Sequence, residues 1–132
     1  RAFDIMIRNA SFRLVRAMAS RDGERFVQIL EELGPSEVPL LEPGTSEVLT
    51  PGGVERVLEP YWAQHPQLLV DADARSPARV QIERAASDVW PVRQVLSDPE
   101  GDHDHALVLA VDRQASRQDN RLVMTWQGLS VG

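Results

Sequence analysis

One stretch of the chain gathers side chains that could do chemistry. Residues 98–105 read Asp-Pro-Glu-Gly-Asp-His-Asp-His, so two imidazoles and four carboxylates lie within eight positions. Imidazoles and carboxylates bind metal ions and act as general acids and bases. The same residue types also build tight turns, because an aspartate side chain accepts hydrogen bonds from nearby backbone N–H groups. The stretch therefore poses a choice between a reactive site and a turn.

The first four residues of this stretch match a type I turn. Asp is preferred at the first position of such a turn, Pro at the second and Gly at the fourth, and apolar segments flank the stretch on both sides. We therefore expect a structural turn between two strands. Its residues would be Asp98, Pro99, Gly101, Asp102 and Asp104.

The alternative is a metal site at His103 and His105. Residues two apart in a strand point to the same side, so both imidazoles could face one ion. The pair would need further ligands, and folding would have to bring His65 or Asp112 to it. The spacing of Gly and Glu does not fit a helix–loop–helix calcium loop. We predict no metal and no cofactor, with the histidine pair as the alternative.

Other catalytic patterns are absent from the sequence. It contains no glycine-rich phosphate loop, no nucleophile elbow and no helicase motor signature, so we expect no ATPase activity from this chain alone. The absence of cysteine excludes disulfides and thiolate zinc ligands. The net charge is −6, whereas a domain that grips phosphates is usually basic. Nucleic acid is therefore expected to be handled elsewhere.

The N-terminal half has the apolar periodicity of helices. Asp22 and Thr50 are predicted N-caps, and Pro60 is expected to kink or shorten the helix in which it lies. The first helix has apolar stripes on two sides, so we expect the sheet to cover one of them. A neighbouring helix, a second copy or the rest of a longer protein would cover the other. The predicted helices are residues 1–20, 24–33 and 51–64.

The C-terminal half has the pattern of strands. A packed loop with many Pro and Gly residues, 34–53, connects the second and third helices, with a short strand near 47–49. Residues 106–111 have no polar alternation, which is typical of a strand covered on both faces. Helices followed by strands predict an α+β fold, with the helices on one face of a curved antiparallel sheet. The predicted strands are residues 67–70, 78–83, 89–97, 106–111 and 121–126.

Three stretches of the sequence resemble a bacterial family. They are Leu-Glu-Pro-Tyr-Trp at 58–62, Asp-Ala-Arg-Ser-Pro at 73–77, and the segment 90–104, which is the most specific. The family is a domain of unknown function that follows the motor core of DEAD/DEAH-box superfamily 2 helicases, chiefly in GC-rich bacteria. The resemblance extends over about residues 1–131. The order of elements also resembles the nuclear transport factor 2-like cone, in which a curved antiparallel sheet wraps a long first helix.

The resemblance implies a non-catalytic accessory domain. We expect residues 1–132 to form a single domain, a C-terminal fragment of a longer cytoplasmic protein without a membrane span. Its partner would be the motor core of the parent chain or another protein, and ATP and nucleic acid would bind only to the parent. The isolated domain is not expected to be an enzyme.

Two alternatives stay open. Cone folds often hold an apolar pocket, so the chain could bind a small molecule or act as an isomerase-like or hydrolase-like enzyme. The residues of such a pocket would be Tyr61, Trp62, Trp90, Arg93 and Trp126. Cone folds also often pair through the outer sheet face, which the apolar strand at 106–111 suits. The second alternative is therefore a dimerisation module, forming a homodimer through that face.

Overall fold

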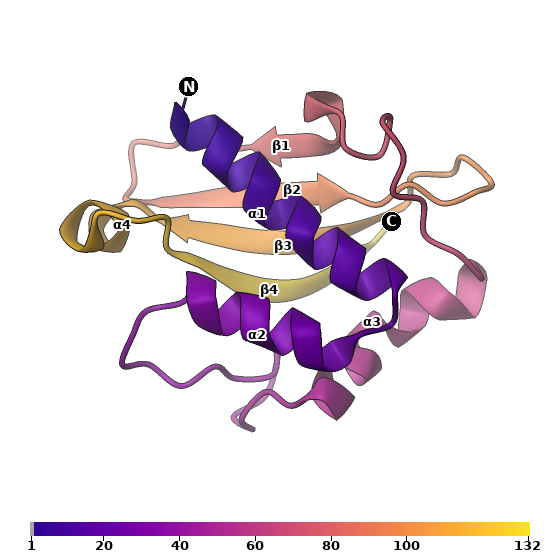
Figure 1. The fold of residues 1–132 in the computed structure, drawn as a ribbon, viewed down its shortest axis with the longest axis horizontal. Coiled ribbons are helices and arrows are strands. Elements are labelled where there is room, and N and C mark those ends of the chain that lie inside the picture. The colour runs from indigo at the N-terminus through magenta and orange to yellow at the C-terminus, as the bar shows by residue number, and fades with distance from the viewer. Residues whose placement is uncertain (1) are drawn as a thin grey trace.

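The computed structural model describes residues 2–132 and places an antiparallel sheet against a layer of helices (Figure 1). The sheet has the strand order β1-β2-β3-β4, so each strand pairs with its neighbour in the sequence. The strands are β1 (Val80–Ile82), β2 (Val89–Val95), β3 (His105–Asp112) and β4 (Met124–Val131). The helices are α1 (Ala2–Ala19), α2 (Gly23–Leu33), α3 (Pro51–Gln64) and α4 (Arg113–Asp119). The predicted α+β class, with helices at the N-terminal side and an antiparallel sheet, is confirmed.

The helix ends follow the predicted capping chemistry. The Asp22 side chain accepts a hydrogen bond from the backbone N–H of Arg25 at 2.9 Å, which caps α2. Thr50 does the same for α3, accepting from Gly53 N at 3.1 Å. Pro60 lies inside α3 at an exposed position and does not shorten the helix, which has the predicted bounds of 51–64.

Two strand predictions need correction. Residues 67–70 form no strand; Leu68 is buried, and Leu69 N donates a backbone hydrogen bond to Ser97 O. A single backbone hydrogen bond does not form the hydrogen-bond ladder of a β-sheet. The short apolar run instead anchors a connecting segment to the core. The segment predicted as a strand at 78–83 instead begins with a 3₁₀ turn at Pro77–Arg79, which is followed by β1.

The sequence prediction also missed α4 and misplaced the last strand. Asp112 caps α4 by accepting from Ala115 N at 2.9 Å. Asn120 ends the helix in the left-handed conformation, with φ of 50°. β4 consequently starts at Met124, later than the predicted 121–126, and continues to Val131.

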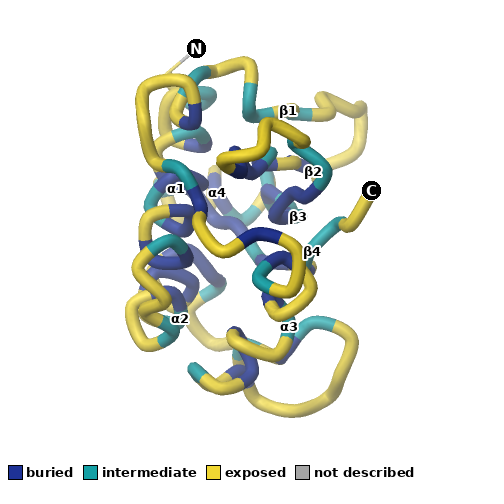
Figure 2. The backbone as a smooth tube through the Cα atoms, turned by 90° about the vertical axis from the view of Figure 1, so that its right-hand side faces the viewer, coloured by how far each residue is buried: buried dark blue, intermediate teal, exposed yellow. Residues whose placement is uncertain are grey.

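The core lies between the inner face of the sheet and the helices. Inner-face side chains alternate with outer-face ones along β2 and β3, where Val92, Leu107 and Leu109 are almost fully buried. In Figure 1, α1 crosses this face obliquely and α2 runs beside it. Figure 2 shows the buried residues on the sides where helices and sheet face one another.

The outer face of the sheet is only partly covered. Val108 and Ala110 of β3 are half-buried there, so the predicted cover on both faces is incomplete. Arg93 lies across this face from β2. Its guanidinium donates to Gln81 Oε1 on one neighbouring strand at 3.3 Å and to Ser130 Oγ on β4 at 2.9 Å.

The second apolar stripe of α1 is covered mainly by the same chain. Phe12 and Val15 of this stripe are buried, and Ala72 and Arg75 line a shallow depression beside Phe12. Ile5, at the start of the stripe, is 49% exposed. The part of this stripe that the chain leaves uncovered therefore lies in the first turns of α1.

Candidate functional site

The acidic stretch forms the predicted turn. Gly101 N donates to Asp98 O at 3.0 Å, and Gly101 adopts a φ of +78°, which glycine allows without strain. The Asp98 carboxylate, 2% exposed, accepts from the backbone N–H groups of Asp102 at 2.9 Å and His103 at 2.8 Å. The Asp98 side chain therefore binds the backbone of the turn that follows it.

Folding brings His65 to this turn from the end of α3. Its Nδ1 lies 2.7 Å from Glu100 Oε1, and its Nε2 lies 3.1 Å from Asp104 Oδ1. The neighbouring His105 places its Nδ1 2.8 Å from the same Asp104 oxygen. We call these residues, together with Asp98 at 3.7 Å from His65 Nδ1, the histidine–carboxylate cluster.

Electrostatics in the cluster favour a charged His65 and charged aspartates. Burial opposes a charge on His65, but hydrogen bonds to Glu100 and Asp104 outweigh it, so the pKa of His65 is raised. Burial also opposes a charge on Asp98, yet the N–H groups of Asp102 and His103 hold the pKa of this carboxyl below its usual value. The pKa of Asp104 is lowered in spite of burial, because both imidazoles donate to it. The three carboxylates thus favour the protonated form of His65.

Tyr61 closes the cluster on the side of α3. It is fully buried, and its ring centroid lies 5.0 Å from that of His65 and 5.3 Å from that of His105. Its hydroxyl donates to Gln67 O at 2.6 Å. Burial raises the pKa of Tyr61, and the neighbouring carboxylates raise it further. The tyrosine is therefore a neutral packing partner of the histidines.

The structure does not pair His103 with His105 as the sequence suggested. His103 precedes β3 and adopts a φ of +50°, so the two residues do not lie on one strand. Ligand atoms of His65, Asp104 and His105 instead lie within 4.8 Å of one another, as do those of His65, Asp98 and Glu100. The sequence offered no local signal for this grouping, because His65 stands 35 positions before Glu100.

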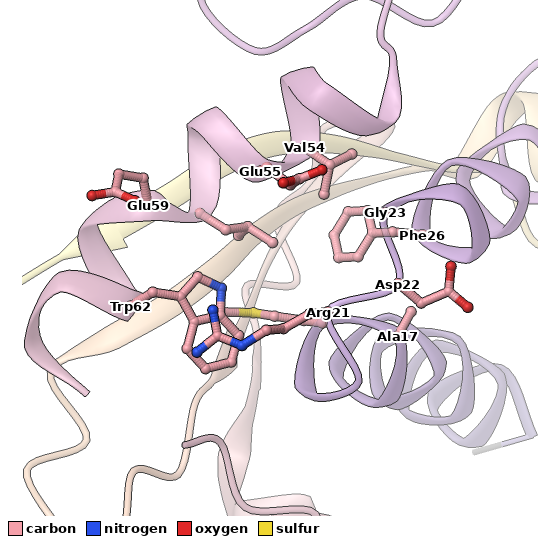
Figure 3. A pocket seen from close by; sticks show the side chains of 11 residues that line it. Ala17, Arg21, Asp22, Gly23, Phe26, Val54, Glu55, Glu59 and Trp62 are labelled. Atoms are coloured by element: carbon pink, nitrogen blue, oxygen red, sulfur yellow. The ribbon is translucent and has the colours of Figure 1, made fainter. Parts of the chain in front are cut away.

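A small pocket lies where α1, α2 and α3 meet (Figure 3). The Arg21 guanidinium lies 3.7 Å from the centroid of the Trp62 ring, a cation–π contact. Phe26 and Val54 face the same pocket, whose volume is about 140 Å³. This space is smaller than an ordinary ligand pocket of roughly 300–1,000 Å³.

A second depression lies between the first turns of α1, the start of β2, and α4. Trp90 forms part of it, with Phe3 edge-on at 6.2 Å and the Arg113 guanidinium 4.4 Å from the ring centroid. Met6, 43% exposed, completes its apolar part. We call this surface the Trp90 groove; its lining includes Phe3, Met6, Trp90, Arg113, Arg117 and Arg121.

The residues predicted to line one ligand pocket do not all lie together, although the rings of Tyr61 and Trp62 meet edge-on with centroids 5.0 Å apart. Tyr61 packs on the histidines, whereas Trp62 lines the helical pocket and Trp90 its own groove. Trp126 is buried against Phe26 at 4.8 Å, and Arg93 lies on the outer sheet face. Tyr61 and Trp62 project about 100° apart from α3, so beyond their mutual contact they face different surroundings.

These features define an α+β domain with a sheet covered on one face and a buried histidine–carboxylate cluster at one end. No helix among residues 2–132 is long and apolar enough to cross a membrane. The model of the family described as Domain of unknown function (DUF3516) matches residues 1–129, and the chain belongs to this family. No curated protein matches the chain, and no solved structure does.

Proposed function

We propose that the chain is a non-catalytic accessory domain that docks, through the Trp90 groove, on the motor core of a helicase-like parent protein. The observation that carries this proposal is the groove itself, in which the half-buried Phe3 and Trp90 and the exposed Met6 lie beside three arginines. Trp, Met and Arg are the residue types enriched in protein interfaces.

The apolar floor offers an adaptable contact surface. Met6 and the adjoining Ile5 are 43% and 49% exposed, which places two large apolar side chains in solvent on the first turns of α1. Trp90 provides a rigid face beside them, since Phe3 and Arg113 hold its ring. A flexible methionine next to an anchored tryptophan suits a partner surface with some freedom of fit.

The charges around the groove indicate what the partner presents. Arg113 forms no ion pair among residues 2–132, while Arg117 and Arg121 pair with exposed aspartates at 3.1 and 3.3 Å. The exposed Arg117 pair is of a kind that is weak, whereas Arg121 also donates to Glu32 O and Gly34 O at 3.0 and 2.8 Å. The groove is thus locally basic on a chain of net charge −6, and we propose a complementary surface with an apolar centre and carboxylates around it.

The position of the groove supports docking within the same parent chain. It includes the first turns of α1, and in the family that the sequence resembles the motor core precedes this domain. A core that leads directly into α1 would lie beside the groove. Docking in the same chain needs little intrinsic affinity, because the connection keeps the two surfaces at high effective concentration.

Hydrogen exchange tests this proposal in the intact parent protein. Amides of residues 3–6 and 113–121 are expected to exchange more slowly in the parent than in the 132-residue chain, because the docked core covers them. Met6→Glu should remove the difference, since a carboxylate would face the proposed acidic surface. Val48→Glu, at a 64% exposed position outside the groove, is the matched control and should leave it intact. Equal exchange in the parent and in the chain would refute docking.

The non-catalytic part of the proposal has its own test. The 132-residue chain alone should neither hydrolyse ATP nor bind RNA or DNA tightly at physiological salt. Sub-micromolar binding that persists as salt is raised would contradict it, because the affinity of an accessory domain for phosphates should vanish under those conditions.

We also propose self-association through the outer sheet face as a second candidate role. The helices cover the opposite face (Figure 1), and the outer face carries the half-buried Val108 and Ala110 beside Arg93. Sedimentation velocity at increasing concentration should show a dimer that Val108→Lys abolishes. A chain that stays monomeric over the accessible concentration range would refute this role.

A further inference from the structure

We propose that the histidine–carboxylate cluster binds a divalent transition-metal ion of the zinc class, with His65, Asp104 and His105 as ligands. This site is independent of the docking proposal and differs from the His103–His105 pair that the sequence suggested. Imidazole nitrogen and carboxylate oxygen are ligands that Zn²⁺ accepts. The two imidazoles come from separate parts of the chain, the end of α3 and the start of β3.

The donor atoms are close to the arrangement that such an ion needs. Asp104 Oδ1 lies 3.1 Å from His65 Nε2 and 2.8 Å from His105 Nδ1, and all three atoms lie within 4.8 Å of one another. A tetrahedral ion with bonds of about 2.0–2.1 Å separates its ligands by about 3.3 Å. Small side-chain shifts therefore open the central position, and a water completes four-coordination.

Burial and charge also favour a cation at this place. His65 and His105 are 2% and 1% exposed, whereas the Asp104 side chain is 27% exposed and gives access from solvent. The carboxylates of Asp98, Glu100 and Asp104 surround the imidazoles. The buried Asp98, the half-buried Asp104 and the exposed Glu100 carry more negative charge than one protonated imidazole offsets, and a divalent ion reduces this excess.

The surroundings of His65 are those of a metal-binding histidine. Glu100 Oε1 lies 2.7 Å from its Nδ1, so the proton stays on Nδ1 and Nε2 is directed at the ion. A carboxylate in this position orients and strengthens histidine ligands in known zinc sites. When the ion binds, His65 releases its Nε2 proton to solvent.

His105 can take the tautomer that a ligand at Nδ1 needs. It is almost fully buried, its Nδ1 points at Asp104, and its Nε2 has no hydrogen-bond partner among residues 2–132. Moving the ring proton to Nε2 frees Nδ1 for the ion without breaking a hydrogen bond at Nε2.

The other group of close donors is a poorer site. It joins His65 with Asp98 and Glu100, and thus offers a single imidazole. Both carboxylate oxygens of Asp98 already accept backbone hydrogen bonds of the turn, at 2.9 and 2.8 Å. An ion there would have to break the turn, so we assign the site to the group that contains His105.

The experiment uses the 132-residue chain after treatment with a chelator. Co²⁺ should give the visible absorption of a four-coordinate ion with imidazole and carboxylate ligands, at one ion per chain. Zn²⁺ at a hundredfold excess over its Kd should raise the Tm by roughly 8 °C. Asp104→Asn keeps the size of the ligand and should weaken Co²⁺ binding by at least tenfold. His103→Asn changes the third histidine of the same turn and should leave binding unchanged.

NMR of the wild-type chain keeps the test decisive if a variant fails to fold. The chain has three histidines, and Zn²⁺ should shift the ring nitrogens of His65 and His105 but leave those of His103 in place. Absence of Co²⁺ absorption, unchanged Zn²⁺ affinity in Asp104→Asn, or loss of binding in His103→Asn would each overturn the assignment.

Discussion

Replacing Asp98 by Ala should destabilise the folded chain by about 3 kcal/mol. The carboxylate is buried and accepts two backbone hydrogen bonds, from Asp102 N and His103 N. Each hydrogen bond to a charged group contributes about 1.5–3 kcal/mol. Asp102 is exposed and His103 half-buried, so water can reach their N–H groups after the substitution. The lower end of that range therefore applies to both bonds, which gives about 3 kcal/mol.

Urea unfolding at neutral pH, with chelator present, measures this loss. Asp102→Ala is the matched control, because it removes a carboxylate from the same turn at an exposed position. It should change the free energy of unfolding by no more than about 0.5 kcal/mol. If the two variants lose equal stability, the carboxylate of Asp98 does not hold the turn, and the structural account of the acidic stretch fails.

Three further outcomes follow from the buried contacts. With chelator present, the difference in free energy of unfolding between the wild type and Asp98→Asn should narrow below about pH 4. The pKa of Asp98 is lowered in the folded state, so its contribution to stability is lost as the pH falls through that pKa. Ser116→Ala should cost about 1–3 kcal/mol in urea unfolding, since it leaves Val123 N, now 2.9 Å from Ser116 Oγ, without its acceptor. Phe26→Ala should cost about 3–5 kcal/mol in thermal unfolding, because it opens a cavity against Trp126; a loss below about 1 kcal/mol would contradict the packing.

Local chemistry made much of the fold predictable. Asp22 and Thr50 cap the helices that follow them, and Asp98 fixes the turn after it, with donors and acceptors within five positions. Such interactions depend on neighbours in the sequence and on little else. The α+β class followed in the same way, from the change of apolar periodicity from helix to strand.

Long-range packing made the rest unpredictable. The helix at Arg113–Asp119 has few apolar residues, so no periodicity marked it; Asp112 caps it and Ser116 ties it to Val123. The contact of His65 with Asp104 spans 39 positions. Sequence spacing pointed instead to His103, whose left-handed backbone excludes the regular strand on which that prediction depended.

The turn and the histidine–carboxylate cluster form one structural unit. A turn and a binding site are therefore not exclusive alternatives for this stretch, as the sequence suggested. Asp98 holds the backbone N–H of His103 at a positive φ, a conformation that is costly for a residue with a side chain. The next residue, Asp104, then meets both His65 and His105 through one carboxylate oxygen. The carboxylate that builds the turn is thus unavailable as a ligand, while the one that follows it is in position to bind. A stretch of alternating Asp and His can therefore fold as a turn and hold an ion.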